Sequence, residues 1–178
     1  SILDVQIIHL KALIDYLSSR NIPYEIGNKY CRQVWYRCKG KRFFALGLEN
    51  HKGGWELRNK YFKTSSSPKT FSFFERESKQ LIITEGMFDF LSLATIDEDI
   101  VQNSDCIILN SLAFLESIKM LIPKYEKVLL FLDNDPAGKK AADSLLNQFD
   151  NVTNCSDFYS GYIDLNEKLI NEGSFKNS

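Results

Sequence analysis

The sequence lacks several features that define common classes of protein. No stretch approaches the roughly 18 consecutive apolar residues of a membrane-spanning helix, so we expect no contact with a membrane. The first residues, SILDVQIIHLKALIDYL, contain neither the basic segment nor the cleavage site of a signal peptide. No internal repeat is visible. Because the chain begins with Ser and not Met, we expect a fragment of a longer protein.

Cysteine and histidine are also scarce. The four cysteines, at positions 31, 38, 106 and 155, form no CxxC pair, and there are only two histidines. Structural zinc sites use four such residues at short, paired spacings, so we predict no zinc in this chain. Cys106 lies in an apolar run, which is typical of a buried free thiol. Cysteine usage therefore indicates a reduced, cytoplasmic protein.

Charge is distributed very unevenly along the chain. Residues 28–69 contain eleven Lys and Arg and only two acids, a local charge of +9, whereas the remainder has 11 basic and 21 acidic residues, a charge of −10. The basic part indicates a polyanionic partner, and the acidic part indicates a site for cations. Aromatic residues between the basic ones either stack on nucleic-acid bases or form the core of strands. They are Trp35, Tyr36, Phe43, Phe44, Trp55, Tyr61 and Phe62.

The basic part is expected to form a small α+β subdomain over residues 1–75. Apolar spacing predicts a helix over 4–19, and strands follow at 31–36 and 42–48 around the turn Lys39-Gly40-Lys41. A further strand is expected within 55–62.

Residues 76–178 have a different pattern, which predicts an α/β domain. Continuous apolar runs alternate with amphipathic helical segments, the arrangement typical of a parallel sheet with helices on both faces. The predicted strands are 81–84, 106–109, 127–132 and a short one at 152–155. A helix is expected after each of the first three strands, and a last helix is expected over 164–171.

Carboxylates follow the predicted strands at the points where ligands bind in such sheets. Glu85 and Asp89 follow the first strand, and Asp133 and Asp135 follow the third. Clustered carboxylates need a counter-charge, and the hard cation Mg²⁺, or Mn²⁺, supplies it. Gly86 is expected to allow a tight turn and a close approach by a ligand. Individually, Asp135 is also explained as the N-cap before Pro136, and Asp89 as a helix-surface acid.

Together these residues resemble a known domain. Glu85-Gly86-x-x-Asp89 and, about 45 residues later, Asp133-x-Asp135-x-x-Gly138 are similar to the motifs of the Toprim domain of topoisomerases, bacterial primases and certain nucleases. The resemblance implies a Rossmann-like Toprim sheet in which Glu85 and Asp89 are catalytic and Glu85, Asp133 and Asp135 bind Mg²⁺. It adds Asp164 as a further metal ligand. One departure is Asn110-Ser111, where many members have Gly.

The residues upstream resemble one branch of this family. Gly53 to Phe62, followed by Ser67-Pro68-Lys69, is similar to the basic subdomain of primases from plasmids and conjugative transposons, in which a zinc ribbon usually comes first. The resemblance implies a nucleotidyltransferase that makes primers on single-stranded DNA from nucleoside triphosphates, with a helicase or relaxase as partner. The candidate residues for binding nucleic acid or nucleotide are Arg58, Lys60, Lys63 and Lys69.

Three alternatives remain from the sequence. One is a Toprim nuclease or strand-transfer enzyme, and another is a nucleic-acid-binding fragment that is inactive without its missing domains. A third, a phosphatase with an Asp-x-Asp nucleophile, ranks low because that motif lies near the start of the chain in such enzymes, whereas FLDND lies late here.

Overall fold

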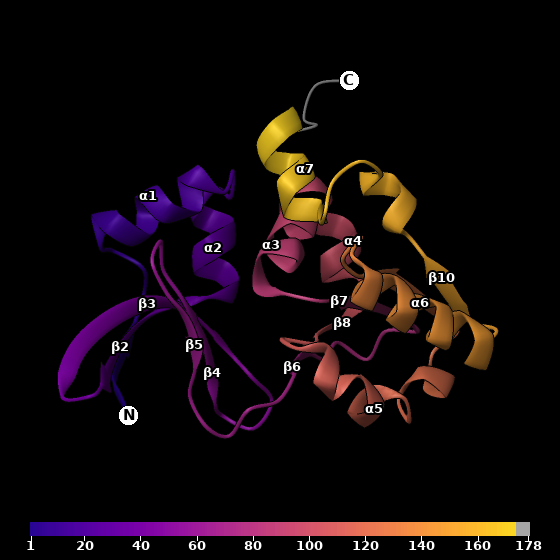
Figure 1. The fold of residues 1–178 in the computed structure, drawn as a ribbon, viewed down its shortest axis with the longest axis horizontal. Helices are drawn as coiled ribbons and strands as arrows, with labels where there is room; N and C mark the ends of the chain where they lie inside the picture. The colour runs from indigo at the N-terminus through magenta and orange to yellow at the C-terminus, as the bar shows by residue number, and fades with distance from the viewer. Residues whose placement is uncertain (174–178) are drawn as a thin grey trace. The chain divides into compact units, whose positions relative to one another are not determined.

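A computed structural model describes residues 1–173 and divides the chain into two units between Thr70 and Phe71 (Figure 1). We call Ser1–Thr70 unit 1 and the part from Phe71 onward unit 2. Each unit contains one five-stranded sheet. Within residues 1–173, no helix combines the length and the apolar character needed to cross a bilayer.

Unit 1 is an antiparallel sheet with two helices. The strands pair in the order β1-β2-β3-β4-β5, and the two-residue turn Lys39-Gly40, with both φ angles positive, joins β2 to β3. Positive φ at both positions matches the right-handed twist of the strands, which explains why this hairpin was predictable. The elements are β1 (Ile2–Gln6), α1 (Lys11–Ser19), α2 (Tyr24–Tyr30), β2 (Arg32–Cys38), β3 (Lys41–Glu49), β4 (Trp55–Arg58) and β5 (Lys63–Ser65).

The prediction of one helix over 4–19 was wrong in its first part. Residues 2–6 form a strand that pairs with β2, and the helix begins only at Lys11. The Gln33 side chain accepts hydrogen bonds from the backbone N–H groups of His9 and Leu10, which fixes the chain where the strand ends and the helix begins. The strand expected within residues 55–62 occupies only the first part of this range, because β4 ends at Arg58 and a turn follows.

Unit 2 contains a mostly parallel sheet in the order β10-β9-β7-β8-β6. The four predicted strands are present and parallel, which confirms the α/β fold class, but the edge strand β6 was not predicted and runs antiparallel to β8. The strands are β6 (Ser72–Phe74), β7 (Gln80–Thr84), β8 (Asp105–Ile108), β9 (Lys127–Phe131) and β10 (Val152–Asn154). The helices are α3 (Met87–Ile96), α4 (Glu98–Gln102), α5 (Leu115–Ile118), α6 (Pro136–Gln148) and α7 (Leu165–Glu172), with 3-10 turns η1 (Leu112–Phe114), η2 (Ile122–Lys124) and η3 (Ser156–Tyr159).

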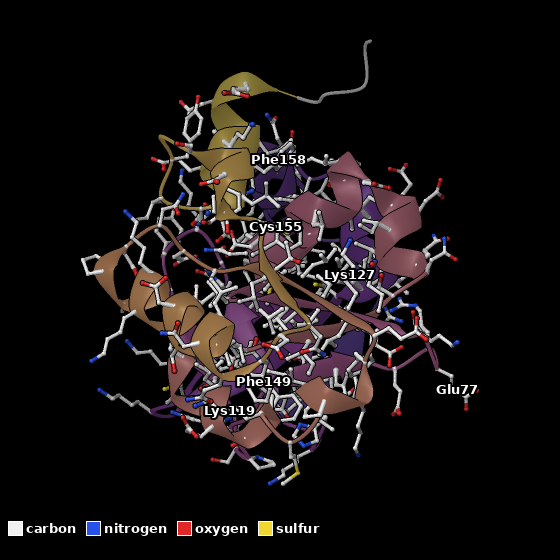
Figure 2. The ribbon with its side chains drawn as sticks, turned by 90° about the vertical axis from the view of Figure 1, so that its right-hand side faces the viewer. Glu77, Lys119, Lys127, Phe149, Cys155 and Phe158 are labelled. Carbon is white, nitrogen blue, oxygen red and sulfur yellow. The ribbon has the colours of Figure 1, made fainter. Side chains whose placement is uncertain are left out.

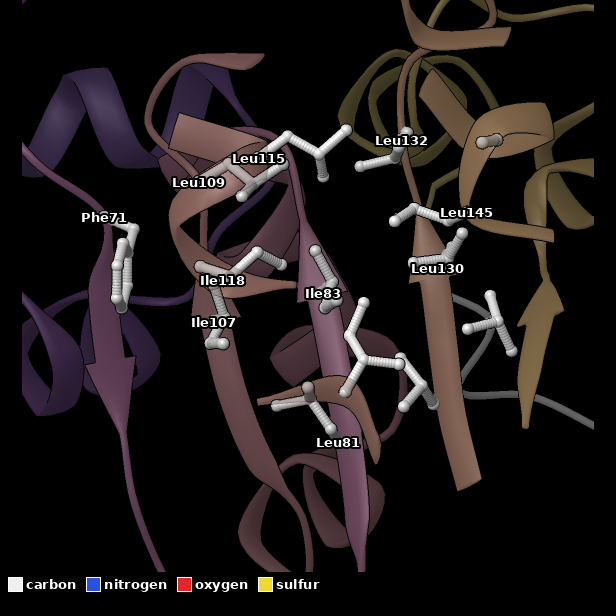
Figure 3. Packing of buried hydrophobic residues seen from close by; sticks show 14 residues of the cluster. Phe71, Leu81, Ile83, Ile107, Leu109, Leu115, Ile118, Leu130, Leu132 and Leu145 are labelled. Carbon is white, nitrogen blue, oxygen red and sulfur yellow. The ribbon is translucent and has the colours of Figure 1, made fainter. Parts of the chain in front are cut away.

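Helices cover both faces of this sheet, with α3, α4 and α7 on one side and α5 and α6 on the other (Figure 1). Alternate strand residues such as Ile83, Ile107 and Leu130 point toward the second side, where they pack with Ile118 of α5 and Leu145 of α6 (Figure 3). The single helix predicted after the second strand is instead three short pieces, η1, α5 and η2. Pro123 lies within η2 and has no N–H with which to continue an α-helix.

Strand order determines where the acidic residues meet. The central strand β7 lies between β8 and β9, and Thr84 at its end is level with Phe131 at the end of β9. Glu85 follows Thr84 directly, and Asp133 follows Phe131 after one further residue. Their side chains therefore lie at the same edge of the sheet.

Candidate metal centre

The first group of carboxylates consists of Glu85, Asp133 and Asp135. One ligand atom from each lies within 4.8 Å of the others. The backbone N–H of Asp133 donates to Glu85 Oε1 at 3.2 Å, which holds the Glu85 carboxylate against the end of β9. Asp135 also accepts a hydrogen bond from the N–H of Gly138 at 2.7 Å through Oδ1, so it is the N-cap of α6. A carboxylate has two oxygens, and capping with one leaves the other for a ligand.

The second group consists of Asp89, Asp133 and Asp164, again with ligand atoms within 4.8 Å. Asp89 is buried in α3, so the interpretation of it as a surface acid was wrong. Asp164 caps α7 by accepting from the N–H of Glu167 at 2.7 Å. Asp133 belongs to both groups and is therefore the centre of the arrangement.

Burial and like charge act together on these acids. Partial burial, followed by the charges of Glu85, Asp164 and Asp135, raises the pKa of Asp133 to about 8. Burial and the neighbouring Asp164 and Asp133 raise the pKa of Asp89 well above its usual value. Among the described residues, the buried Oδ1 of Asp133 has no hydrogen-bond partner. An all-oxygen donor set with a buried, unsatisfied oxygen at its centre fits a hard divalent cation such as Mg²⁺.

The raised pKa of Asp133 has a consequence for stability that can be measured. The folded protein holds the proton of the Asp133 carboxyl group more tightly than the unfolded chain does. The protonated group therefore contributes its full stabilisation below about pH 4, and this stabilisation is lost as the pH rises toward 8. In a chelating buffer we expect the free energy of unfolding to fall between pH 5 and pH 8. The expected fall is on the order of 1–3 kcal/mol, after allowance for solvent screening of a partly exposed group.

Urea unfolding at the two pH values measures this effect, and Asp133→Asn is the control because it removes the titrating group. The difference between the two proteins isolates the contribution of Asp133 from that of other residues. Equal pH dependence in wild type and variant would contradict the prediction.

Asn134, between the two aspartates, holds a loop against the carboxylate groups by hydrogen bonds. Its side-chain amide donates to the carbonyl oxygens of Tyr162 at 3.1 Å, Tyr159 at 3.3 Å and Ser156 at 3.5 Å, and its backbone N–H donates to Ile163 O at 2.6 Å. This loop leads to Asp164, so Asn134 positions a member of the second group. No sequence pattern indicated these bonds, because the accepting groups are backbone carbonyls more than twenty residues away.

The same loop is held from its other side by α7. Phe158 lies beside this helix (Figure 2), where the Lys168 ammonium lies 4.2 Å from the centre of the Phe158 ring and donates to Phe158 O at 2.6 Å. The Tyr159 hydroxyl donates to Leu132 O, just before Asp133. The loop is therefore tied both to the end of β9 and to the helix that Asp164 caps.

The two glycines of the motifs have different roles. The chain passes from β7 to α3 through a bend of only two residues, Glu85 and Gly86, but Gly86 has φ −134°, an extended conformation that any residue adopts, so this turn does not require glycine. A Cβ at Gly86 would meet only Asp89 Oδ2, at 3.6 Å. At Gly138, by contrast, a Cβ would lie 2.1 Å from the carbonyl oxygen of Asp133. Gly138 thus lets the first turn of α6 pack directly against the backbone of the central aspartate.

Asn110, where the family pattern often has Gly, adopts a left-handed conformation with φ 64°. Asn is among the few non-glycine residues that accept this conformation at low cost. Its N–H donates to Glu85 O at 3.0 Å, and its side-chain amide donates to Ser72 Oγ of β6 at 3.1 Å. The departure from the family pattern therefore preserves the backbone turn beside Glu85.

The predicted binding cations lie in unit 1. Arg58 ends β4 and pairs with Lys63 at the start of β5. Partial burial raises the pKa of Glu56, and the positive charges of Lys63, Lys69 and Arg58 oppose this rise, in that order. The structure thus places three of the four cations around one carboxylate. Lys60 lies in the following turn, with its ammonium 5.8 Å from the centre of the Tyr61 ring.

Each unit matches one known protein family. Residues 2–67 match a domain of unknown function (DUF8464), and residues 82–169 match the Toprim-like family. Unit 2 contains a Toprim-like domain. Its two motifs are those that supply Glu85, Asp89, Asp133 and Asp135, at the edge where the sheet brings them together. No curated protein matches the sequence.

Solved structures of primases share the fold of the chain. The primase fragment of the bacteriophage T7 primase-helicase protein matches with a TM-score of 0.65 and 18% identity, over 88% of this chain and 69% of that one. A structure of the bacteriophage T7 lagging-strand DNA polymerase with primase domains of two gp4 subunits, bound to an RNA/DNA hybrid and dTTP, matches with a TM-score of 0.66 and 20% identity, over 88% and 84%.

The zinc-binding and RNA polymerase domains of the Aquifex aeolicus primase match with a TM-score of 0.63 and 18% identity. That match covers 94% of this chain but 54% of the Aquifex chain, so the present sequence spans about half of it. All three matches extend across both units of the chain, which therefore shares its fold with these structures.

Proposed function

We propose that the chain is the metal-dependent nucleotidyltransferase core of a DNA primase, which joins nucleoside triphosphates into primers on single-stranded DNA for replication or transfer of a mobile element. The observation that carries the proposal is the pair of carboxylate groups that share Asp133 at the edge of a Toprim sheet. The fold shared with primase fragments and the charge of +9 over residues 28–69 support it.

The carboxylates have distinct proposed tasks. Asp133, Asp135 and Asp164, together with Glu85, would hold Mg²⁺ or Mn²⁺. When bound, such ions neutralise the charge that develops on the transferring phosphate and its leaving group. Glu85, at the end of β7, accepts the proton of the attacking hydroxyl group. Asp89 lies behind them, accepts the N–H of Asn166 at 3.5 Å and keeps the second group together.

The proposed partners follow from the same comparison. The T7 structure contains primase domains bound to an RNA/DNA hybrid and dTTP, and that primase is part of a primase-helicase protein. For this chain we propose single-stranded DNA and nucleoside triphosphates as ligands, bound by Arg58, Lys60, Lys63 and Lys69. A helicase or a relaxase is the proposed protein partner.

Glu85→Gln is expected to reduce primer synthesis by about 100-fold or more, because it removes the proton acceptor and leaves the size of the side chain unchanged. The assay measures incorporation of labelled ribonucleotides on single-stranded DNA with Mg²⁺ and an added zinc-binding domain. Glu77→Gln is the matched control, since Glu77 is an exposed acid of unit 2 (Figure 2) that precedes β7, whereas Glu85 follows this strand, and it belongs to neither carboxylate group.

Other outcomes of this assay would overturn the proposal. If the full-length protein makes no primers and Glu85→Gln behaves like wild type, the chain is not a primase core. Cleavage of labelled DNA with Mg²⁺ or Mn²⁺ would assign the carboxylates to a Toprim nuclease. DNA binding without Mg²⁺ and without turnover would indicate a binding fragment.

A further inference from the structure

Unit 1 contains a pocket of about 300 Å³, lined in part by the turn that holds the candidate cation Lys60. One wall is α1, which contributes Leu13, Asp15 and Tyr16, and the floor includes Phe44 of β3. The turn after β4 closes the pocket with Lys60 and Tyr61. Its volume is at the lower end of the range for sites that bind small ligands.

Three of the residues that line the pocket are aromatic: Tyr16, Phe44 and Tyr61. Phe44 is half-buried and touches Trp35 edge to face, with ring centres 5.4 Å apart, while Tyr16 is buried. Tyr61 is 78% exposed, although it is a large aromatic side chain. Its turn is rigid, because Asn59 Oδ1 accepts hydrogen bonds from the N–H groups of both Tyr61 and Phe62. An exposed ring beside an aromatic floor suits a flat ligand.

Positive charge lies on the same face of the sheet as this floor. Phe44 and Trp35 are cross-strand partners, and Arg42 and Arg37 are the next pair on that face because strand residues two apart share a face. The Arg42 guanidinium lies 4.2 Å from the centre of the Trp35 ring. The pocket thus opens beside a row of cations and aromatic rings, the combination that binds single-stranded nucleic acid.

The lining of the pocket itself carries one charge of each sign, from Asp15 and Lys60. Asp15 is its acidic member, and Lys11 pairs with one carboxylate oxygen at 2.6 Å. A carboxylate repels phosphate, whereas it accepts hydrogen bonds from the ring and amino N–H groups of a base. The lining thus offers Asp15 as an acceptor for the N–H groups of a base, while Lys60, Arg42 and Arg37 offer cations to the phosphates.

We infer that this pocket binds one unstacked nucleobase, between Phe44 and Tyr61. The inference rests on the proposed binding of nucleic acid and adds a position at which a single base leaves the stack. The same chemistry would accept a base of the template strand or the base of a free nucleoside triphosphate, and the experiment distinguishes these two sources.

The test uses Tyr61→Ala, with Phe62→Ala as the matched control. Both residues lie in one turn and are exposed. Phe62 contacts Phe43, on the opposite face of the sheet from Phe44, and its ring centre lies 6.4 Å from that of Tyr61, so this variant also shows what the loss of the contact between the two rings does by itself. Binding of oligonucleotides that contain one 2-aminopurine, and of 2-aminopurine riboside triphosphate, is followed by fluorescence. Tyr61→Ala is expected to weaken binding by about 5- to 100-fold and to reduce quenching of the probe, while Phe62→Ala leaves both near wild type.

The salt dependence of binding distinguishes contacts to the base from contacts to the phosphates. Tyr61→Ala is expected to leave the slope of log affinity against log salt unchanged, whereas Lys60→Gln lowers it by about 0.7 for a single strand. An effect of Tyr61→Ala on the oligonucleotide alone identifies a strand base, and an effect on the triphosphate alone identifies the incoming nucleotide. Both results support the pocket.

Two results would overturn the inference, and they are distinguishable. If wild type binds and Tyr61→Ala is no weaker than Phe62→Ala, the pocket does not bind a base, but the proposed function stands. If wild type binds neither probe at any salt concentration, the proposed function fails with it. Circular dichroism verifies that the exposed substitutions leave the fold unchanged.

Discussion

Asp133→Asn is expected to abolish binding of divalent ions and to reduce primer synthesis by more than about 100-fold. Asp133 is the one residue common to both carboxylate groups, so its loss affects each of them. Substitution of a residue that only supports a metal ligand typically lowers metal affinity or activity by about 10- to 100-fold. The loss of a central ligand is expected to lower them at least as much. The same substitution removes a partly buried acid that lies among like charges, so the metal-free variant is expected to be no less stable than wild type.

Titration with Mn²⁺ and urea unfolding in a chelating buffer together test this pair of effects. Asp143→Asn is the matched control, because Asp143 is an exposed acid of α6 outside both groups. A structural role for Asp133 would lower stability and metal binding together, whereas the metal role predicts a loss of binding alone. Equal Mn²⁺ affinity in wild type and Asp133→Asn would rule out the proposed metal centre.

Gly138→Ala is expected to lower the free energy of unfolding by about 1–3 kcal/mol and to weaken metal binding. The new Cβ would lie 2.1 Å from the carbonyl oxygen of Asp133 and 2.9 Å from its carbonyl carbon. The backbone of Asp133 must then move, and its carboxylate moves with it. Helix propensity alone predicts the opposite sign, a gain of about 1 kcal/mol for Ala over Gly within a helix.

Gly86→Ala is the matched control for this substitution, because it lies beside the same acids but has room for a methyl group. We expect its unfolding midpoint in urea to remain close to that of wild type in the absence of metal. A Gly138→Ala protein as stable as wild type, or more stable, would show that the close contact with Asp133 is not a constraint.

The parts of the fold that could be predicted are those with a strong local signal. The strands at 81–84, 106–109 and 127–132 are continuous apolar runs, and burial of both sheet faces requires such runs. The convergence of Glu85 and Asp133 followed from them, because parallel strands end at the same edge. The turn Lys39-Gly40 was predictable from its glycine.

The parts that could not be predicted depend on contacts between distant residues. β6 has three residues, too few to show a period, and its pairing with β8 lies more than thirty residues away. The first strand, 2–6, has apolar positions that fit a helical period equally well, and only the partner β2 decides between them. The burial of Asp89 and the bonds of Asn134 to a remote loop likewise arise only in the folded chain.

The left-handed residue Asn110 has a consequence for how homologous sequences can differ. At φ 64° the position admits Gly, Asn and Asp readily, whereas a β-branched residue would cost on the order of 1–2 kcal/mol or more. Asn also holds Ser72 in the neighbouring edge strand, a bond that Gly cannot make. Positions 72 and 110 are therefore expected to vary together among homologous sequences. Where position 110 is Gly, a hydroxyl group at position 72 is no longer required as the acceptor of this hydrogen bond.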